Sequence, residues 1–236
     1  MSKSSEASIT NQMHLAYSAI TSINSDDDLS ASLQLQGFSR SMIDQGETLY
    51  NAATEAISSE IIAEEELEVK VKTADELQKE IRKLYAQFTA TASECFGRDA
   101  LEMLGLRSGK PRSSKAYCES LNSSIIKLSR CPELSKRLQA KGFDQECIKR
   151  ASEVTASYET AMGQLIKLEK NLEIATKKRN TAMFTLRNWL SSFAEAVIFA
   201  SESRPYILKQ LGMDKKELCA VAHIDIRKIA RELKVQ

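Results

Sequence analysis

The feature that most constrains this chain is a run of fifty residues, between Gly46 and Gly97, without glycine or proline. Apolar or small residues recur in it at spacings of three and four, the pattern of one helical face. These residues are Ala53, Ile57, Leu67, Val71, Ala74, Leu77, Ile81, Leu84, Phe88 and Ala92. Such a stripe has to be covered by neighbouring helices, so we predict a long tract that packs against others.

The sequence leaves open whether this tract is one helix or a helical hairpin. Thr73-Ala-Asp-Glu76 has the form of a capping box, which marks helix starts, and Val69 and Val71 alternate with lysines. The apolar register does not break at this point. We therefore favour long antiparallel helices over a hairpin.

The sequence aligns with itself at an offset of 105 residues. Residues 18–43 then match residues 123–148 with nine identities in 26 positions. The matches include a Gly-Phe pair at Gly37 and Gly142, where a left-handed glycine is well suited to ending a helix. The sequence thus predicts two tandem repeats, a common route to a continuous core.

Each repeat is expected to hold the same succession of helices. A helix of about four turns (8–24 and 114–129) precedes a short one (27–35 and 132–140), the Gly-Phe turn, the long tract and a brief helix ending at Leu-Gly. Glycines (8) and prolines (3) are too scarce for the turns of a β-sheet protein. We therefore predict an all-α tandem pseudo-repeat helical bundle with long antiparallel helices.

Three ranges are predicted as parts of this architecture. Residues 1–110 form an acidic first repeat, residues 111–213 a basic second repeat, and residues 214–236 a C-terminal amphipathic helix. The boundary between the repeats falls in "RSGKPRSSK", residues 107–115, which contains Gly109 and Pro111.

The most apolar stretch, "LRNWLSSFAEAVIFASESRPYILKQLGM" (186–213), contains the only tryptophan, Trp189. In the first repeat Leu84 stands where Trp189 stands in the second. A cofactor site unique to one half would not be expected to reappear as generic apolar residues in the other. We therefore predict that Trp189 and Phe193 belong to the core.

Several segments together resemble a group of uncharacterised prokaryotic all-helical proteins made of two such repeats. These are "ATKKRNTAMFTLRNWLSSFA" (175–194), "RPYILKQLG" (204–212), "LGLRSGKPRS" (104–113) and the L-x-x-K-G-F turn. The resemblance covers about residues 15–213, and the first repeat departs from it by lacking the tryptophan. It implies an architecture and lends no catalytic residue, because no activity is established for that group.

The two halves of the sequence have opposite net charges. Residues 1–110 carry 10 Lys/Arg against 18 Asp/Glu, a net charge of −8, and residues 111–236 carry 23 against 14, a net charge of +9. Two charge runs, 63–72 and 177–179, are expected on solvated helix faces. An antiparallel packing of the two repeats, within or between chains, would set acid against base and select orientation.

No complete constellation for phosphate or metal binding is present. "GLRSGK" (105–110) differs from a P-loop because its glycines are one residue too close and Pro111 replaces Ser or Thr. A di-metal centre needs two Glu-x-x-His motifs, and the chain has only His14 and His223, neither of which follows a glutamate by three. We predict no metal site and no cofactor.

No catalytic residue is predicted either. The chain lacks a G-x-S-x-G motif, and the odd number of cysteines without a C-x-x-C pair suggests neither disulfides nor zinc. Reduced, mostly buried thiols are expected, with Cys95 and Cys147 at core positions. The five cysteines are Cys95, Cys118, Cys131, Cys147 and Cys219.

The N-terminus lacks the apolar stretch of a secretory signal, and the longest apolar run, Ala196–Ala200, is far shorter than a membrane span. We expect a cytoplasmic protein. Nucleic acid is not an expected partner, because the lysines are interspersed with glutamates and not with aromatic residues.

These observations favour a non-enzymatic helical-bundle protein that binds a protein partner or itself. Its expected working surface is the charged, partly apolar exterior of the long helices, with the C-terminal helix as a second surface. The alternatives are a membrane-associating or pore-forming helical protein and, third, a small-molecule carrier or enzyme with a pocket between the repeats.

Overall fold

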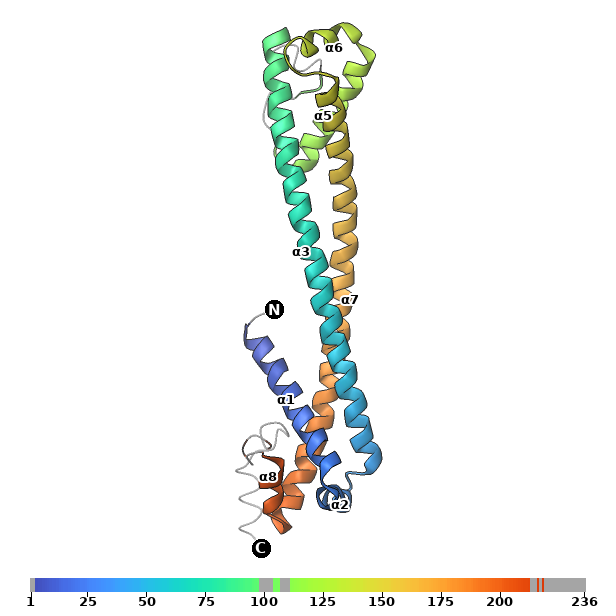
Figure 1. The fold of residues 1–236 in the computed structure, drawn as a ribbon, viewed down its shortest axis with the longest axis vertical. Helices are drawn as coiled ribbons and strands as arrows, with labels where there is room; N and C mark the ends of the chain where they lie inside the picture. The colour runs from blue at the N-terminus through green and yellow to red at the C-terminus, as the bar shows by residue number, and fades with distance from the viewer. Residues whose placement is uncertain (1–2, 98–103, 107–110, 213–215, 217, 219–236) are drawn as a thin grey trace. The chain divides into compact units, whose positions relative to one another are not determined.

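The computed structural model describes residues 3–97, 104–106, 111–212, 216 and 218, and for residues 3–7 only the backbone. All regular secondary structure in these residues is helical, which confirms the all-α prediction. The helices, labelled in Figure 1, are α1 (Lys3–Ser25), α2 (Asp27–Leu35), α3 (Arg40–Phe96), α5 (Ser114–Arg130), α6 (Pro132–Gln139), α7 (Gln145–Ser203) and α8 (Tyr206–Leu211).

The chain divides into two compact units, and the first combines two separate segments, Met1–Ile62 and Glu173–Gln236. This unit 1 holds α1, α2, the beginning of α3, the end of α7, and α8. Its buried core draws on all five helices and includes Ala16, Ile23, Leu29, Leu33, Phe38, Ile43, Leu186, Trp189, Phe193, Val197 and Ile207. Leu218 also belongs to this core, whereas the rest of the predicted C-terminal helix, apart from Lys216, lies outside the described residues.

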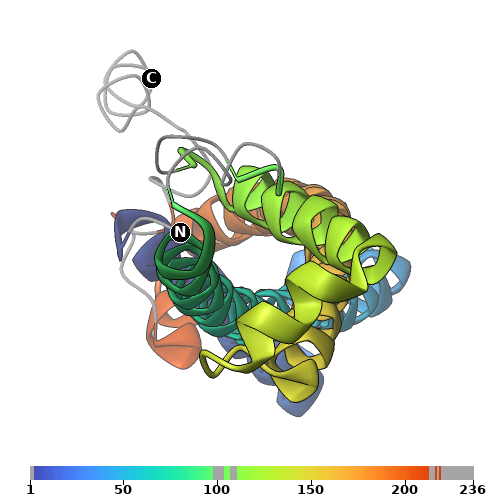
Figure 2. The ribbon, with the colours of Figure 1, turned by 90° about the horizontal axis from the view of Figure 1, so that it is seen from above.

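Unit 2 spans Ala63–Leu172 and holds the remainder of α3, α5, α6 and the beginning of α7. Seen from above, α5 and α6 lie beside the C-terminal part of α3 and the N-terminal part of α7 (Figure 2). The core of unit 2 includes Ile81, Leu84, Phe88, Leu104, Leu121, Leu128, Leu138, Phe143, Ala151 and Val154.

The two units are not the two predicted repeats. Each unit takes part of its helices from residues 1–110 and the rest from residues 111–236. The described residues therefore show no clear separation into two repeats, and the predicted boundaries stay predictions.

Each long tract is one helix, so the hairpin alternative is wrong. Helix α3 continues through the proposed capping box, where the Thr73 hydroxyl donates a hydrogen bond to the Val69 carbonyl (3.0 Å) inside the helix. The predicted stripe is buried or half-buried except at Val71, which is 41% exposed.

Helices α3 and α7 run antiparallel within each unit, as predicted. Residue numbers fall along α7 as they rise along α3. In unit 1 the contacting pairs are Met42–Trp189 and Glu60–Arg179. In unit 2 Glu80 pairs with Arg150, and Ala74 clusters with Ala161 and Leu165.

The predicted Gly-Phe turns are confirmed. Gly37 has φ +85°, the Phe38 N–H donates to the Leu33 carbonyl (3.0 Å), and the Gly37 N–H donates to the Gln34 carbonyl (3.0 Å). This pair of bonds is a Schellman motif, which satisfies carbonyls at the end of α2. Helix α6 ends in the same way, at Gly142 (φ +90°), with bonds from Phe143 to Leu138 and from Gly142 to Gln139. Both phenylalanines are thereby directed into a core.

Candidate interaction surface

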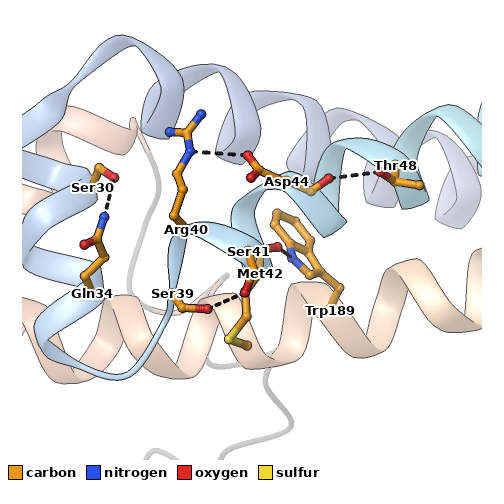
Figure 3. A network of polar contacts seen from close by, with 9 residues as sticks. All are labelled: Ser30, Gln34, Ser39, Arg40, Ser41, Met42, Asp44, Thr48 and Trp189. Atoms are coloured by element: carbon orange, nitrogen blue, oxygen red, sulfur yellow. Dashed lines mark hydrogen bonds and ion pairs between the residues drawn. The ribbon is translucent and has the colours of Figure 1, made fainter.

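The tryptophan region is interior packing. The Trp189 side chain is 5% exposed, and its indole N–H donates to the Met42 carbonyl (2.6 Å), as Figure 3 shows. The ring stacks on Phe193 with centroids 5.7 Å apart and contacts Phe38 at 5.9 Å. The indole therefore has a polar partner and aromatic neighbours inside unit 1, as expected of a core residue.

Gly46 of α3 makes room for this tryptophan. A Cβ atom built on Gly46 would overlap the six-membered ring of Trp189. The repeat offset of 105 residues relates Gly46 to Ala151 and Trp189 to Leu84. Both of these residues of unit 2 are buried. A small residue on one helix thus accompanies the large ring on the other.

A buried ion pair joins α3 to α7 in unit 1. Arg179 Nη1 lies 2.6 Å from Glu60 Oε2, and the two side chains are only 7% and 3% exposed. The Thr176 hydroxyl donates to Glu60 Oε1 (2.8 Å), and Asn180 Oδ1 accepts from Arg179 (2.9 Å). Hydrogen bonds to both partners offset the cost of removing these charges from water.

Sequence reasoning missed this pair. We predicted that residues 177–179 lie on a solvated face, which is wrong for Arg179 because its side chain points into the interface with α3. The sequence did contain a signal for it. The repeat offset of 105 residues relates Glu60 to Leu165 and Arg179 to Ala74, so two apolar residues stand in place of two opposite charges. A paired change from apolar to charged residues is what a new buried ion pair requires.

The described cysteines are free thiols that differ in burial. Burial, and then the Glu159 carboxylate, raises the pKa of the Cys118 thiol to about 11. Burial and a hydrogen bond with Asp144 raise the pKa of Cys147. Cys131 is exposed and Cys95 half-buried, so the expectation of mostly buried thiols is wrong for the part of the chain described. Cys219 lies outside it.

The remaining predicted motifs contribute little chemistry. His14 is exposed on α1, and His223 and residues 107–110 of the P-loop-like segment lie outside the described residues. Where side chains are described, no group of three His, Cys, Asp or Glu could hold a metal ion. No described helix has the length and apolar character that crossing a bilayer requires.

A groove of about 630 Å³ runs between the two long helices in unit 2. It is lined by Glu65, Glu66, Val69 and Lys70 of α3 and by Gln164, Lys167, Leu168 and Asn171 of α7. Val69 is 64% exposed, and Leu168 is half-buried. The groove therefore offers apolar side chains between groups of both charge signs.

The groove lies on the thinnest part of unit 2. Helix α5 begins beside α3, where the Gln78 amide contacts Ser114, and then follows α3 toward its C-terminal end, since Tyr117 contacts Tyr85. Among the described residues of unit 2, the part of α3 before Gln78 packs on α7. The buried cluster there consists of Ala74, Ala161 and Leu165, with Leu67 and Leu77 partly buried against it.

Such a cluster is small for a packed layer of two helices. Further large apolar side chains of this part of unit 2 are exposed. They are Val71, Met162 and Ile166, with exposed fractions of 41%, 38% and 66%.

A second hollow, of about 450 Å³, lies between α1 and α3 in unit 1. Its lining includes Met13 and Ile57, together with His14 and a pair of tyrosine rings, Tyr17 and Tyr50, with centroids 5.9 Å apart. Both helices belong to residues 1–110, so this hollow is not the pocket between repeats that the carrier alternative requires.

Comparisons of the chain with protein-family models, with curated proteins and with solved structures found no match.

Proposed function

We propose that the chain is a non-enzymatic assembly protein, which works by packing the groove of unit 2 against an amphipathic helical surface. The observation that carries the proposal is the groove itself, which is lined by the apolar side chains of Val69 and Leu168 together with charged side chains of both signs. Its lining side chains suit packing and charge pairing.

Helical geometry supports this choice of partner. A groove between two antiparallel helices accepts the side-chain ridge of a third helix, and two such pairs together form a four-helix bundle. Burying a valine or leucine side chain contributes roughly 1.5–3 kcal/mol. A partner helix would therefore enlarge the small cluster around Ala74 and Leu165 at the place where unit 2 is thinnest.

The test is the solution mass of the full chain, measured by light scattering after size exclusion over a range of concentrations. We expect a mass above the 26.3 kDa of one chain, which Val69→Lys lowers. Ile126→Lys is the matched control, because Ile126 is also exposed, at 52%, but lies on α5 outside the groove.

Circular dichroism of both variants verifies that the helices remain folded. A wild-type chain that stays a monomer at every concentration would contradict the proposal. An equal effect of the two lysine substitutions would contradict it as well.

A further inference from the structure

We infer that the partner at the groove is a second copy of the chain, related by a two-fold axis that crosses α3 near residue 68. The two α3 helices then lie antiparallel across the interface. This inference rests on the proposed function, because it names the occupant of the same groove.

The order of charges along α3 favours this arrangement. Residues 64–72 read Glu-Glu-Glu-Leu-Glu-Val-Lys-Val-Lys, so acid precedes base. When two such segments pack antiparallel with residue 68 opposite itself, Glu66 of each copy faces Lys70 of the other. Both side chains line the groove. A two-fold interface forms each such pair twice.

The other two-fold arrangement, with its axis parallel to the helices, sets α3 of one copy against α7 of the other. Ala74 clusters with Ala161 and Leu165, so Lys70, four residues earlier on α3, lies level with residues 165–169 of the antiparallel α7. These residues include Lys167, which would face Lys70 twice. Like charges in contact disfavour this arrangement.

Apolar side chains supply the attraction in the antiparallel arrangement. Val69 is adjacent to the axis, so the two copies of this exposed residue approach each other at the centre of the interface. Exposed ion pairs contribute little on their own, and their role is to fix the direction in which the copies pack.

Charge reversal tests this geometry by sedimentation velocity on the full chain. Glu66→Lys opposes Lys70 of the second copy, and Lys70→Glu opposes its Glu66. Each single variant should associate about 10- to 100-fold more weakly than the wild type. An equimolar mixture of the two variants should associate again, because both contacts in the mixed dimer are then attractive. The double variant E66K/K70E should also associate.

Glu68→Lys is the matched control. Glu68 lies on the same helix, is 67% exposed and pairs with Lys72 four residues on, as Glu66 and Lys70 are spaced, but it does not line the groove. It should leave association unchanged. High salt should reduce the difference between E66K and the wild type, because exposed charges are then screened.

The outcomes separate the inference from the proposed function. If Val69→Lys dissociates the assembly but neither single charge reversal weakens it, the groove is the interface and the antiparallel geometry is wrong. A Lys70→Glu variant that associates more tightly would instead support the arrangement of α3 on α7. A chain that is monomeric throughout would overturn both.

Discussion

At the scale of single residues, Gly46 and Trp189 show how one helix adapts to the other. The indole occupies the space that a side chain on α3 would need, and its N–H is satisfied by the Met42 carbonyl. Protein interiors are packed to the density of organic crystals, so a volume gained on one helix has to be removed from its neighbour. Trp189 therefore requires a residue without a side chain at position 46, although glycine weakens a helix.

We expect Gly46→Ala to lower the free energy of unfolding by about 1–3 kcal/mol, because the added methyl group overlaps the indole. Gly163→Ala is the control, since Gly163 lies in α7 with nothing within 4 Å of a built Cβ. That change should stabilise by up to about 1 kcal/mol through helix propensity.

Urea unfolding followed by circular dichroism measures both changes. In the background Trp189→Leu, which copies the residue at position 84, Gly46→Ala should cost much less. An unchanged cost in that background would show that the indole is not the obstacle.

Cys118 gives a pH dependence at the same scale. Burial and the nearby Glu159 raise the pKa of its thiol from 9.0 to about 11. The unfolded thiol thus loses its proton at a lower pH than the folded one, and the unfolded state gains stability as pH rises through this interval. The contribution of Cys118 is fully present below pH 9 and is lost between about pH 9 and 11.

The expected result is that the free energy of unfolding falls less steeply from pH 9 to 11 in Cys118→Ala than in the wild type. Urea unfolding at fixed pH values gives this slope, and the constant cost of the smaller side chain does not affect it. Equal slopes for the two proteins would show that Cys118 does not titrate in this way.

At the scale of helices, the pair Glu60–Arg179 sets the register between α3 and α7 in unit 1. A buried charge is tolerated where its partner lies, so sliding one helix by a turn would leave both charges unpaired. The corresponding positions of unit 2, Leu165 and Ala74, are apolar and penalise such a slip less. Register in unit 1 is therefore fixed by charge as well as by shape.

Removing one member of this pair should be far more harmful than removing both. We expect Arg179→Ala to cost about 3–5 kcal/mol, because Glu60 is left charged and buried. The double variant E60L/R179A, which copies the residues of unit 2, should recover most of that loss. Arg150→Ala, in a pair whose arginine is 66% exposed, should cost under about 1 kcal/mol. Urea unfolding of the wild type and the three variants measures these losses. A double variant as unstable as Arg179→Ala would show that the ion pair itself supplies the stability.

Local features of the helices could be predicted from the sequence, and their contacts could not. The turns at Gly37 and Gly142 depend on neighbouring residues alone, and the stripe of α3 follows from its spacing. The burial of Arg179 depends on Glu60, which lies 119 positions earlier. The charge run 63–72 forms one side of the groove, but the sequence does not show which residues of α7 form the other side.

At the scale of the whole chain, the opposite net charges of residues 1–110 and 111–236 are reflected in ion pairs between these two parts of the sequence. Three ion pairs of the described residues join residues 1–110 to residues 111–236, and in each of them the acid comes from the first range and the base from the second. These pairs are Glu60–Arg179, Glu80–Arg150 and Glu94–Lys141. Opposite net charges thus favour packing between the two halves of the sequence over packing within each half.

This arrangement predicts the behaviour of a chain cut at the predicted boundary. Residues 1–110 contain α1, α2 and α3 but lack the α7 side chains that complete both cores, and residues 111–236 lack α3. Each fragment alone should have reduced helix content and no cooperative unfolding, because neither holds a whole unit.

An equimolar mixture of the two fragments should recover the helix content and the cooperative urea transition of the intact chain. Mixing at high salt should slow this recovery, since fragments of net charge −8 and +9 attract each other over long range only when that attraction is unscreened. Stopped-flow circular dichroism at two salt concentrations measures the rate. If each fragment folded cooperatively by itself, the predicted repeats would be independent domains, and the two compact units would not be the folding units of this chain.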